Sequence, residues 1–306
     1  MNERQINAFR HVMRLGSITA AARALFVSQP AVSRLISDLE ADLGFPLFER
    51  RSGKLFPLPE ATVLGHEVER MFYGLERLDQ FAREMRGLRH GRVTIATLPM
   101  ASFSVLPRVL RQFLSQHDGI RVTNNVHNSP RIADLVAAGQ ADIGIAQLAP
   151  ARNDVRRLAS WRCPCVVALP VDHALAGSSQ LTPHDLAGAP MVALSHQTVT
   201  ASYVTERFAE AGVTPDIRVE SQPSYSACGL VAEGVGVAIV DPLTVALFPV
   251  DRVVVVPFAP TIPFDLHVVG HADRPLSRAA SALVDLFIEE MRTTIGVERL
   301  AHNDIA

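Results

Sequence analysis

Hydrophobic positions in the first 58 residues follow helical spacing and are interrupted by residues that cap helices. The pattern predicts a helix over 6–15, a short alanine-rich helix over 20–25 and a third helix over 29–43. Ser28 fits the N-cap of the third helix, and Gly44 fits its end. Two short helices joined by a tight turn are typical of a helix-turn-helix, whose second helix enters the major groove of DNA.

The polar side of the third predicted helix carries Gln29, Ser33, Arg34 and Ser37. Glutamine can pair with two atoms of adenine, arginine with two atoms of guanine, and serine with bases or phosphates. The alternative is a three-helix packing unit whose polar face is only solvated. Helical spacing alone does not decide between these two interpretations.

Residues 45–58 predict two short strands that form a hairpin with a basic tip. Such a hairpin fits a wing that contacts the phosphate backbone. Residues 1–58 hold eight Lys or Arg against five Asp or Glu, although the whole chain has a net charge of −2. The residues predicted to contact DNA in this winged helix-turn-helix are Thr19, Ser28, Gln29, Pro30, Ser33, Arg34, Ser37, Arg50, Arg51 and Lys54.

Residues 59–90 predict a linker formed by one long helix with an apolar seam. The apolar positions alternate in steps of four and three, as in a coiled coil: Leu64, Val68, Met71, Leu75, Leu78, Ala82 and Met85. A free helix would expose this seam, so we expect it to pack against a second copy of the chain, with packing against the head as the alternative.

Beyond Gly91, short apolar runs alternate with amphipathic segments, which predicts an α/β domain with a parallel sheet. Two successive units of this kind predict two lobes, one formed by about 91–161 plus 270–306 and the other by 162–269. Two chain crossings between the lobes would leave a cleft where strand ends and helix starts meet. We expect a small molecule to bind in that cleft.

The composition is that of a globular protein, with 48% apolar and 20% charged residues in 306. The chain has no long apolar run and no apolar signal at its start, so we expect a cytoplasmic protein without membrane contact. Cys163, Cys165 and Cys228 lack the spacing of a zinc site. We interpret them as structural thiols, with a redox role for the Cys163 and Cys165 pair as the alternative.

Several stretches together carry a resemblance to a known family: Gly-Ser-Ile-Thr-Ala-Ala-Ala at 16–22, Leu-Phe-Val-Ser-Gln-Pro-Ala-Val-Ser-Arg at 25–34, and Leu-Phe-Glu-Arg at 47–50. The chain closely resembles the LysR-type transcriptional regulators. The resemblance extends through the sensor region at 91–95, 139–145 and 234–239. One departure is Leu58-Pro59-Glu60-Ala61, where most members have Thr-Pro-x-Gly before the linker helix.

The resemblance implies a winged helix-turn-helix, a linker helix and a two-lobed sensor like a periplasmic binding protein. It also implies binding to pseudo-palindromic double-stranded DNA, a dimer of dimers (a homotetramer) and contact with RNA polymerase. Further stretches at 72–77, 219–221 and 241–244 look like the subgroups that activate diaminopimelate decarboxylase synthesis or regulate opine catabolism. These subgroups imply an activator of lysine biosynthesis that responds to meso-diaminopimelate, with regulation of opine or other amino-acid catabolism as the alternative.

The predicted effector-binding residues lie near strand ends and helix starts: Pro99, Met100, Ser102, Ser129, Gln147, Ser195, Thr198, Tyr225 and Asp241. Ser102 and Ser129 lie where hydroxyl and backbone N–H groups can bind a carboxylate. Asp241 is the candidate partner of an ammonium group, although aspartate before proline is also a common turn residue. Tyr225 fits either a ligand contact or a core position.

Other classes of protein fit the sequence less well. The chain has no nucleophile elbow, phosphate-binding loop or metal-ligand helix motif, so we expect neither an enzyme nor a bound metal or cofactor. The fragment Gly234-Val235-Gly236 precedes a predicted strand instead of following one, which argues against a dinucleotide site. A small-molecule binding protein without DNA function is the other alternative, and the attached head argues against it.

Overall fold

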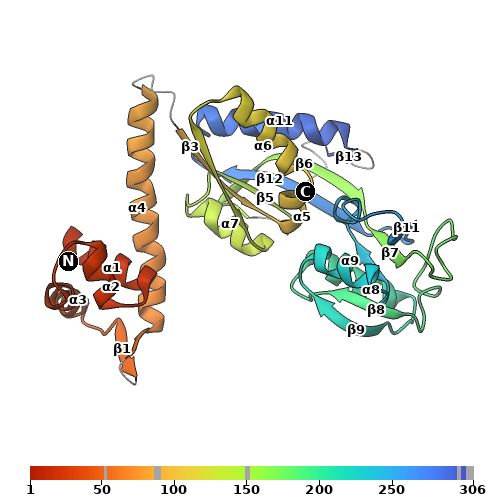
Figure 1. Cartoon of the computed structure of the whole chain (residues 1–306), viewed down its shortest axis with the longest axis horizontal. Coiled ribbons are helices and arrows are strands. Elements are labelled where there is room, and N and C mark those ends of the chain that lie inside the picture. The colour runs from red at the N-terminus through yellow and green to blue at the C-terminus, as the bar shows by residue number, and fades with distance from the viewer. Residues whose placement is uncertain (52–53, 86–90, 149–151, 295–297, 301–306) are drawn as a thin grey trace. The chain divides into compact units, whose positions relative to one another are not determined.

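The computed structural model traces the chain shown in Figure 1 and describes residues 1–51, 54–85, 91–148, 152–294 and 298–300. The chain divides into two compact units, Met1–Ala82 and Arg83–Ala306, which we call the head unit and the sensor unit and describe separately. No helix within the described ranges is both long enough and apolar enough to cross a membrane.

Three helices form the centre of the head unit: α1 (Glu3–Leu15), α2 (Ile18–Ala24) and α3 (Gln29–Leu43). Each helix begins after a residue whose side-chain oxygen accepts a backbone N–H of the first turn, namely Asn2, Ser17 and Ser28. Helices α1 and α3 end at Gly16 and Gly44, where φ values of 63° and 79° favour glycine. The helices share a core that includes Phe9, Val32 and Leu39.

A hairpin and one long helix follow: β1 (Phe48–Arg51), antiparallel to β2 (Lys54–Pro57), and α4 (Pro59–Met85). The predicted apolar seam divides into two parts along α4. Leu64 and Val68 pack on the core of the head, whereas Met71, Leu75 and Leu78 are exposed. The side chains of two further seam positions lie outside the described residues: Ala82 and Met85. The middle of the seam therefore remains open among the described residues of the head unit.

Helix α4 is joined to α1 by a polar contact as well as by apolar packing. Arg10 donates two hydrogen bonds to the carboxylate of Glu69, at 2.9 and 3.0 Å. The guanidinium carbon of Arg10 also lies 4.3 Å from the centre of the Phe72 ring. Two parallel hydrogen bonds together with an aromatic face fix the direction of a guanidinium. This contact holds the first half of α4 against the head.

A six-stranded sheet of order β13-β6-β12-β5-β3-β4 is the centre of the first lobe of the sensor unit. Its strands are β3 (Gly91–Thr97), β4 (Ile120–Val126), β5 (Ile143–Ala146), β6 (Val155–Pro164), β12 (Pro263–His271) and β13 (Glu298–Arg299). Helices α6 and α11 cover one face of the sheet and α7 covers the other (Figure 1). The helices of this lobe are α5 (Pro99–Phe103), α6 (Leu106–Gln116), α7 (Ser129–Ala137) and α11 (Arg278–Thr293).

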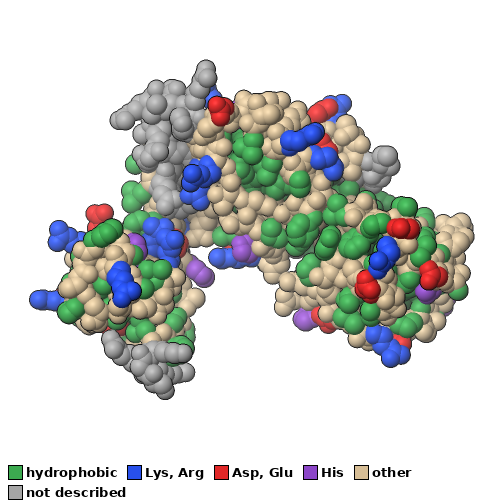
Figure 2. Space-filling model, viewed as in Figure 1, with side chains coloured by type: hydrophobic (Ala, Val, Ile, Leu, Met, Phe, Trp, Pro, Cys, Tyr) green, Lys and Arg blue, Asp and Glu red, His purple; other side chains and the backbone are tan. Residues whose placement is uncertain are grey.

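The second lobe contains two small sheets, of order β10-β7-β11 and β8-β9, joined by a bridge between Met191 and Val237. Its strands are β7 (Val166–Pro170), β8 (Pro190–Leu194), β9 (Asp216–Ser221), β10 (Ala238–Val240) and β11 (Val253–Pro257). Its helices are α8 (Val199–Glu210), α9 (Ser224–Ala232) and α10 (Pro242–Val245). On the face shown in Figure 2, charged side chains are scattered among apolar and uncharged ones.

The prediction of parallel sheets is wrong for part of the sensor unit. Strand β3 is parallel to β4 and β5, and β8 is parallel to β9. However, β12 runs antiparallel to β5 and β6, and β7 runs antiparallel to β10 and β11. The physical reason is the double crossing, because β6 leads out of the first lobe and β12 leads back into it.

The lobe boundary also differs from the expected positions at 161/162 and 269/270. Strand β6 continues to Pro164, and β12 pairs with β6 from Pro263 onward along its whole length. All of β12 therefore belongs to the first lobe. Where the two crossings leave this sheet, the backbone N–H of Cys165 donates to the carbonyl oxygen of Ile262 at 2.8 Å. This hydrogen bond ties the two connections between the lobes together.

Candidate DNA-binding surface and effector cavity

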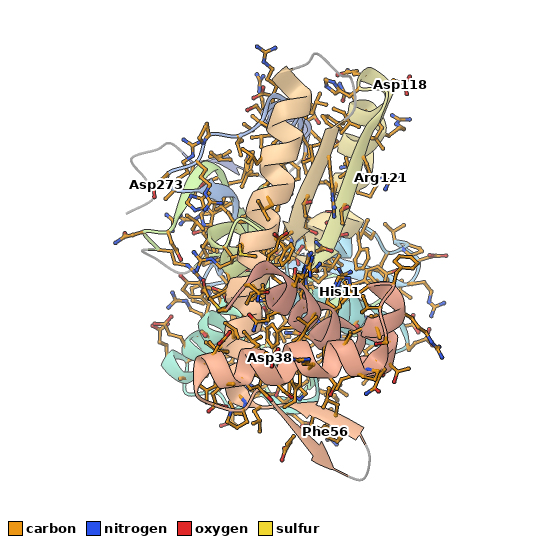
Figure 3. All side chains as sticks on the ribbon, turned by 90° about the vertical axis from the view of Figure 1, so that its left-hand side faces the viewer. His11, Asp38, Phe56, Asp118, Arg121 and Asp273 are labelled. Atoms are coloured by element: carbon orange, nitrogen blue, oxygen red, sulfur yellow. The ribbon has the colours of Figure 1, made fainter. Side chains whose placement is uncertain are left out.

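The predicted DNA-reading face of α3 is open to solvent. Figure 3 shows α3, marked by Asp38, and the hairpin below it, marked by Phe56. Among the predicted DNA contacts, Ser33 is half-buried, and the exposed ones are Thr19, Ser28, Gln29, Pro30, Arg34 and Ser37. The side chains of three others lie outside the described part of the chain: Arg50, Arg51 and Lys54.

Arg34 projects from the middle of this face. Its side chain is 84% exposed, and its Nε lies 3.9 Å from a carboxylate oxygen of Asp38. A pair this long and this exposed contributes little to stability, so the guanidinium can exchange it for a base or a phosphate. At the N-terminus of α3, the Ser28 hydroxyl accepts the backbone N–H of Ala31 at 3.4 Å and helps the helix begin there. The helix is thus formed before DNA arrives.

Glu40 connects the reading helix to the hairpin. Its Oε1 accepts the backbone N–H groups of Leu47 and Phe48, at 2.7 and 3.2 Å. These donors lie at the entry to β1, where the carbonyl oxygen of Leu47 accepts the N–H of Leu58 at 2.9 Å. One carboxylate on α3 therefore sets the path of the chain into the hairpin.

We expect Glu40→Ala to lower the free energy of unfolding of the head by about 2 kcal/mol, because two backbone donors lose a charged acceptor. Glu40→Gln retains an amide oxygen as an acceptor, so the free energy of unfolding should fall by about half as much. Thermal unfolding followed by circular dichroism measures the change. Asp38→Ala, an exposed acid on the same helix, serves as the control and should change stability little. Equal losses for the alanine and glutamine variants would contradict the acceptor role.

A cavity of about 680 Å³ lies between the two lobes of the sensor unit. The first lobe contributes residues that begin α7, and the second contributes residues that begin α8 and α9. Each of these helices has nine or more residues, so the partial positive charge of its N-terminus acts on the cavity. The cavity therefore favours negatively charged groups of a ligand.

Six predicted effector residues line this cavity: Pro99, Met100, Ser129, Gln147, Thr198 and Asp241. The Ser129 hydroxyl accepts the backbone N–H of Gln147 at 3.0 Å, which ties the start of α7 to the end of β5. Thr198 is the N-cap of α8, and its hydroxyl accepts the N–H of Ala201 at 3.2 Å. These polar groups are held in place by the backbone before any ligand binds.

Three predicted effector residues do not line the cavity. Ser102 accepts a hydrogen bond from the side chain of Asn124 at 2.8 Å, because α5 turns this serine toward β4. Ser195 lies in the turn before α8, where its carbonyl oxygen accepts the Thr198 hydroxyl at 2.9 Å. Tyr225 is 45% exposed and lies between the rings of Phe103 and Phe248, so the core role does not describe it.

Several polar lining residues were not predicted from the sequence: His127, Asn128, Arg131, Arg152, Gln197, Thr200, Gln222 and Ser224. One reason is that the apolar spacing predicts helices over 131–138, 204–211 and 226–233, whereas α7, α8 and α9 begin earlier, at Ser129, Val199 and Ser224. Asn128 and Thr198 both cap their helices, and this N-cap signal could have corrected the starts. Arg152 pairs with Asp154 and Asp134 at 2.6 and 2.8 Å, and these hydrogen bonds raise its pKa.

Asp241 is the only acidic residue that lines the cavity among the described residues. It is 1% exposed, and its two oxygens accept the backbone N–H and the hydroxyl of Thr244 at 2.7 and 2.9 Å. Burial raises the pKa of Asp241, and the hydrogen bonds from Thr244 oppose that rise. A buried carboxylate of this kind is stabilised by a proton or by a cation such as an ammonium group.

The three cysteines are buried, free thiols. Burial raises the pKa of Cys163 and of Cys228 to about 12, and it raises the pKa of Cys165 as well. Oxidation and disulfide exchange proceed through the thiolate, which a high pKa disfavours. The arrangement favours structural thiols over a redox pair.

An exposed helix-turn-helix with a hairpin, joined to a two-lobed domain with a cavity between its lobes, defines the class of ligand-responsive DNA-binding regulators. Residues 4–62 match the bacterial regulatory helix-turn-helix protein, lysR family, and residues 86–292 match the LysR substrate binding domain. The chain belongs to the LysR family of bacterial transcriptional regulators. The predicted fold, a winged head with a two-lobed sensor, is thereby confirmed, and family and fold are those of regulators rather than enzymes.

Individual relatives match over most of the chain. The transcriptional activator protein LysR of Escherichia coli (strain K12) is 35% identical over 289 residues, which cover 94% of this chain and 91% of that protein. The octopine catabolism/uptake operon regulatory protein OccR of Rhizobium meliloti is 35% identical over 290 residues and 95% of each chain. Full-length CbnR complexed with its target DNA has the same fold, with a TM-score of 0.71, 20% identity and coverage of 95% and 100%.

Proposed function

We propose that this regulator activates lysine-biosynthesis genes in response to an amino-acid-like effector such as meso-diaminopimelate. The observation that carries the proposal is the charge arrangement of the cavity. The starts of α7, α8 and α9 favour carboxylates, and the buried Asp241 favours an ammonium group. A zwitterion with more than one carboxylate satisfies both. The cavity of about 680 Å³ has a volume typical of small-molecule sites.

The relatives support this choice and supply a second candidate. LysR of Escherichia coli is a transcriptional activator, which supports activation. OccR is equally identical to this chain and regulates octopine catabolism and uptake. An opine also joins carboxylates to an amine, so the same cavity chemistry fits it. Regulation of opine catabolism is therefore the second candidate function.

The head and α4 support binding to DNA as a dimer. Met71, Leu75 and Leu78 are exposed along α4 at spacings of four and three, which fits a second copy of the same helix. Two heads held together in this way would read the two halves of a pseudo-palindromic site. We infer that sensor units then join two dimers into a tetramer and that the tetramer acts on RNA polymerase.

Effector binding can alter transcription only if two assembly states bind the effector with different affinity. The cavity has walls from both lobes, and the lobes are joined by the crossings at Cys165 and Ile262. Closure of the lobes on the effector would therefore change the surface that the sensor unit offers to other copies. A change in the spacing of the heads on DNA would follow.

Calorimetric titration of the full-length protein with meso-diaminopimelate, lysine and octopine tests the effector. We expect saturable binding of meso-diaminopimelate and much weaker binding of lysine, which has one carboxylate fewer. Preference for octopine would favour the second candidate function. Binding of none of the three would discard the proposed effector class while leaving the family membership unchanged.

Asp241→Asn should distinguish a contact of Asp241 with the ammonium group from an effect of Asp241 on stability. A raised pKa in the folded state means that the stability contributed by the protonated form is present below the ordinary value of 3.8 and is lost as pH rises through the folded pKa. Asparagine stays neutral and still accepts the N–H of Thr244. We therefore expect a higher melting temperature than wild type at pH 7 without effector, and no difference below pH 3.8.

The same variant should bind meso-diaminopimelate about 10- to 100-fold more weakly, the range expected when a charged hydrogen bond is lost. Binding of a dicarboxylate without an amine, such as glutarate, should not weaken. An unchanged affinity for meso-diaminopimelate would contradict the ammonium contact at Asp241.

A further inference from the structure

Phe26 has an unusual conformation and exposure in the turn between α2 and α3. Its φ is 55°, and it is the only non-glycine residue with a positive φ among those the structure describes. Its side chain is 96% exposed. The turn itself is well defined, because the N–H of Phe26 donates to Arg23 at 3.2 Å and the N–H of Val27 donates to Ala22 at 3.0 Å.

Both features disfavour phenylalanine in the isolated head. The left-handed conformation is unfavourable for a residue with a bulky side chain, whereas glycine or asparagine adopts it readily. An exposed ring also gains nothing from burial, and Phe26 is absent from the residues that form the head core. A ring held in this way is available to contact a surface of another molecule.

The position of Phe26 indicates which surface that is. Residues 26–31 are all exposed, and they run without interruption from the turn into the first turn of α3. In a helix-turn-helix, the N-terminal residues of the second helix contact base edges in the major groove. The apolar group that a base presents there is the C5-methyl of thymine, which apolar side chains such as phenylalanine contact.

We propose that Phe26 contacts a thymine methyl group at the edge of each operator half-site and thereby contributes to sequence specificity. This inference rests on the proposed reading of DNA by α3. It assigns a base preference to an apolar residue of the turn, in addition to the polar residues of the helix. Burial of one methyl group changes affinity about 4-fold.

A double-mutant cycle between protein and DNA tests the contact. The probe is a duplex selected by the full-length protein from random-sequence DNA, in which each thymine is replaced in turn by deoxyuridine, which lacks only the methyl group. We expect wild type to lose about 4-fold in affinity at one thymine of each half-site. Phe26→Ala should bind the unmodified duplex more weakly and should not respond to the same replacement.

Two further variants separate the contact from folding. Phe26→Asn removes the strain of the left-handed conformation, so it should melt no lower than wild type while losing the thymine response. Leu15→Ala removes an exposed apolar side chain from the end of α1, which is 47% exposed, and should keep the response.

If Phe26→Ala and wild type lose the same factor in affinity at every thymine replacement, the two changes act independently. That result would overturn the proposal. So would a Phe26→Ala variant that binds DNA normally but fails to activate transcription, since that outcome identifies a protein partner for the ring. Failure of α3 to read DNA would appear separately, as an Arg34→Ala variant with unchanged affinity for the selected duplex.

Discussion

Replacing Arg34 by alanine should weaken binding to the selected operator by roughly 1 to 3 kcal/mol while changing binding to random DNA much less. The side chain is 84% exposed on the reading face of α3, and its contact with Asp38 at 3.9 Å is easily exchanged. A guanidinium can donate two parallel hydrogen bonds to guanine, and its loss leaves those acceptors without a protein partner. Fluorescence anisotropy with labelled duplexes at several salt concentrations measures both affinities.

Two controls determine the kind of contact. Arg34→Lys keeps the charge but not the paired donors, so it should retain affinity for random DNA and lose specificity. Arg14→Ala removes an exposed positive charge from α1 and should affect operator and random DNA equally. If Arg34→Ala loses as much affinity on random DNA as on the operator, Arg34 contacts phosphate instead of a base.

Gly236→Ala should lower the free energy of unfolding of the sensor by about 3 kcal/mol, because the added methyl group has no space. A Cβ at this position would lie 2.3 Å from the carbonyl oxygen and 2.8 Å from the carbonyl carbon of Pro190. That carbonyl accepts the N–H of Val237 at 2.8 Å, and Val192 donates back to Val237 at the same distance. The backbone cannot move away without breaking the link between β8 and the strand that follows Gly236.

Gly229→Ala in α9 is the matched control from the same lobe, since a Cβ there would meet nothing within 4 Å. Alanine also favours a helix interior more than glycine does, so this variant should be neutral or slightly more stable. Scanning calorimetry should show a fall of about 10 °C for Gly236→Ala and no fall for Gly229→Ala. Similar melting temperatures for the two variants would refute the steric explanation.

The close packing at Gly236 agrees with the argument from the sequence against a dinucleotide site. The fragment Gly234-Val235-Gly236 resembles part of a phosphate-binding loop. In the structure, Gly234 takes a left-handed φ of 75° at the end of α9, and Gly236 allows two backbone segments to approach closely. Backbone conformation and close packing thus account for both glycines without a bound nucleotide.

Local signals placed the three helices of the head, although α1 begins at Glu3 instead of residue 6 and α2 spans Ile18–Ala24 instead of 20–25. The prediction of helix 29–43 matches α3 at both ends, because its boundaries are set by Ser28 and Gly44 within the same short stretch. Capping and apolar spacing act between residues a few positions apart, so they can be read directly from the sequence. The family motif lies in the same region, so the class of regulator can be read from the sequence without any tertiary contact.

The sensor cavity depended on contacts between distant segments. The antiparallel pairing of β12 with β6 joins residues about a hundred positions apart, and no local pattern specifies it. That pairing sets the lobe boundary, and the packing of α5 against β4 turns Ser102 away from the cavity. The sequence by itself therefore determined the helices of the head, the family and most candidate residues. Tertiary structure decided which of those residues share a cavity, because long-range pairing fixes the direction of each strand end and helix start.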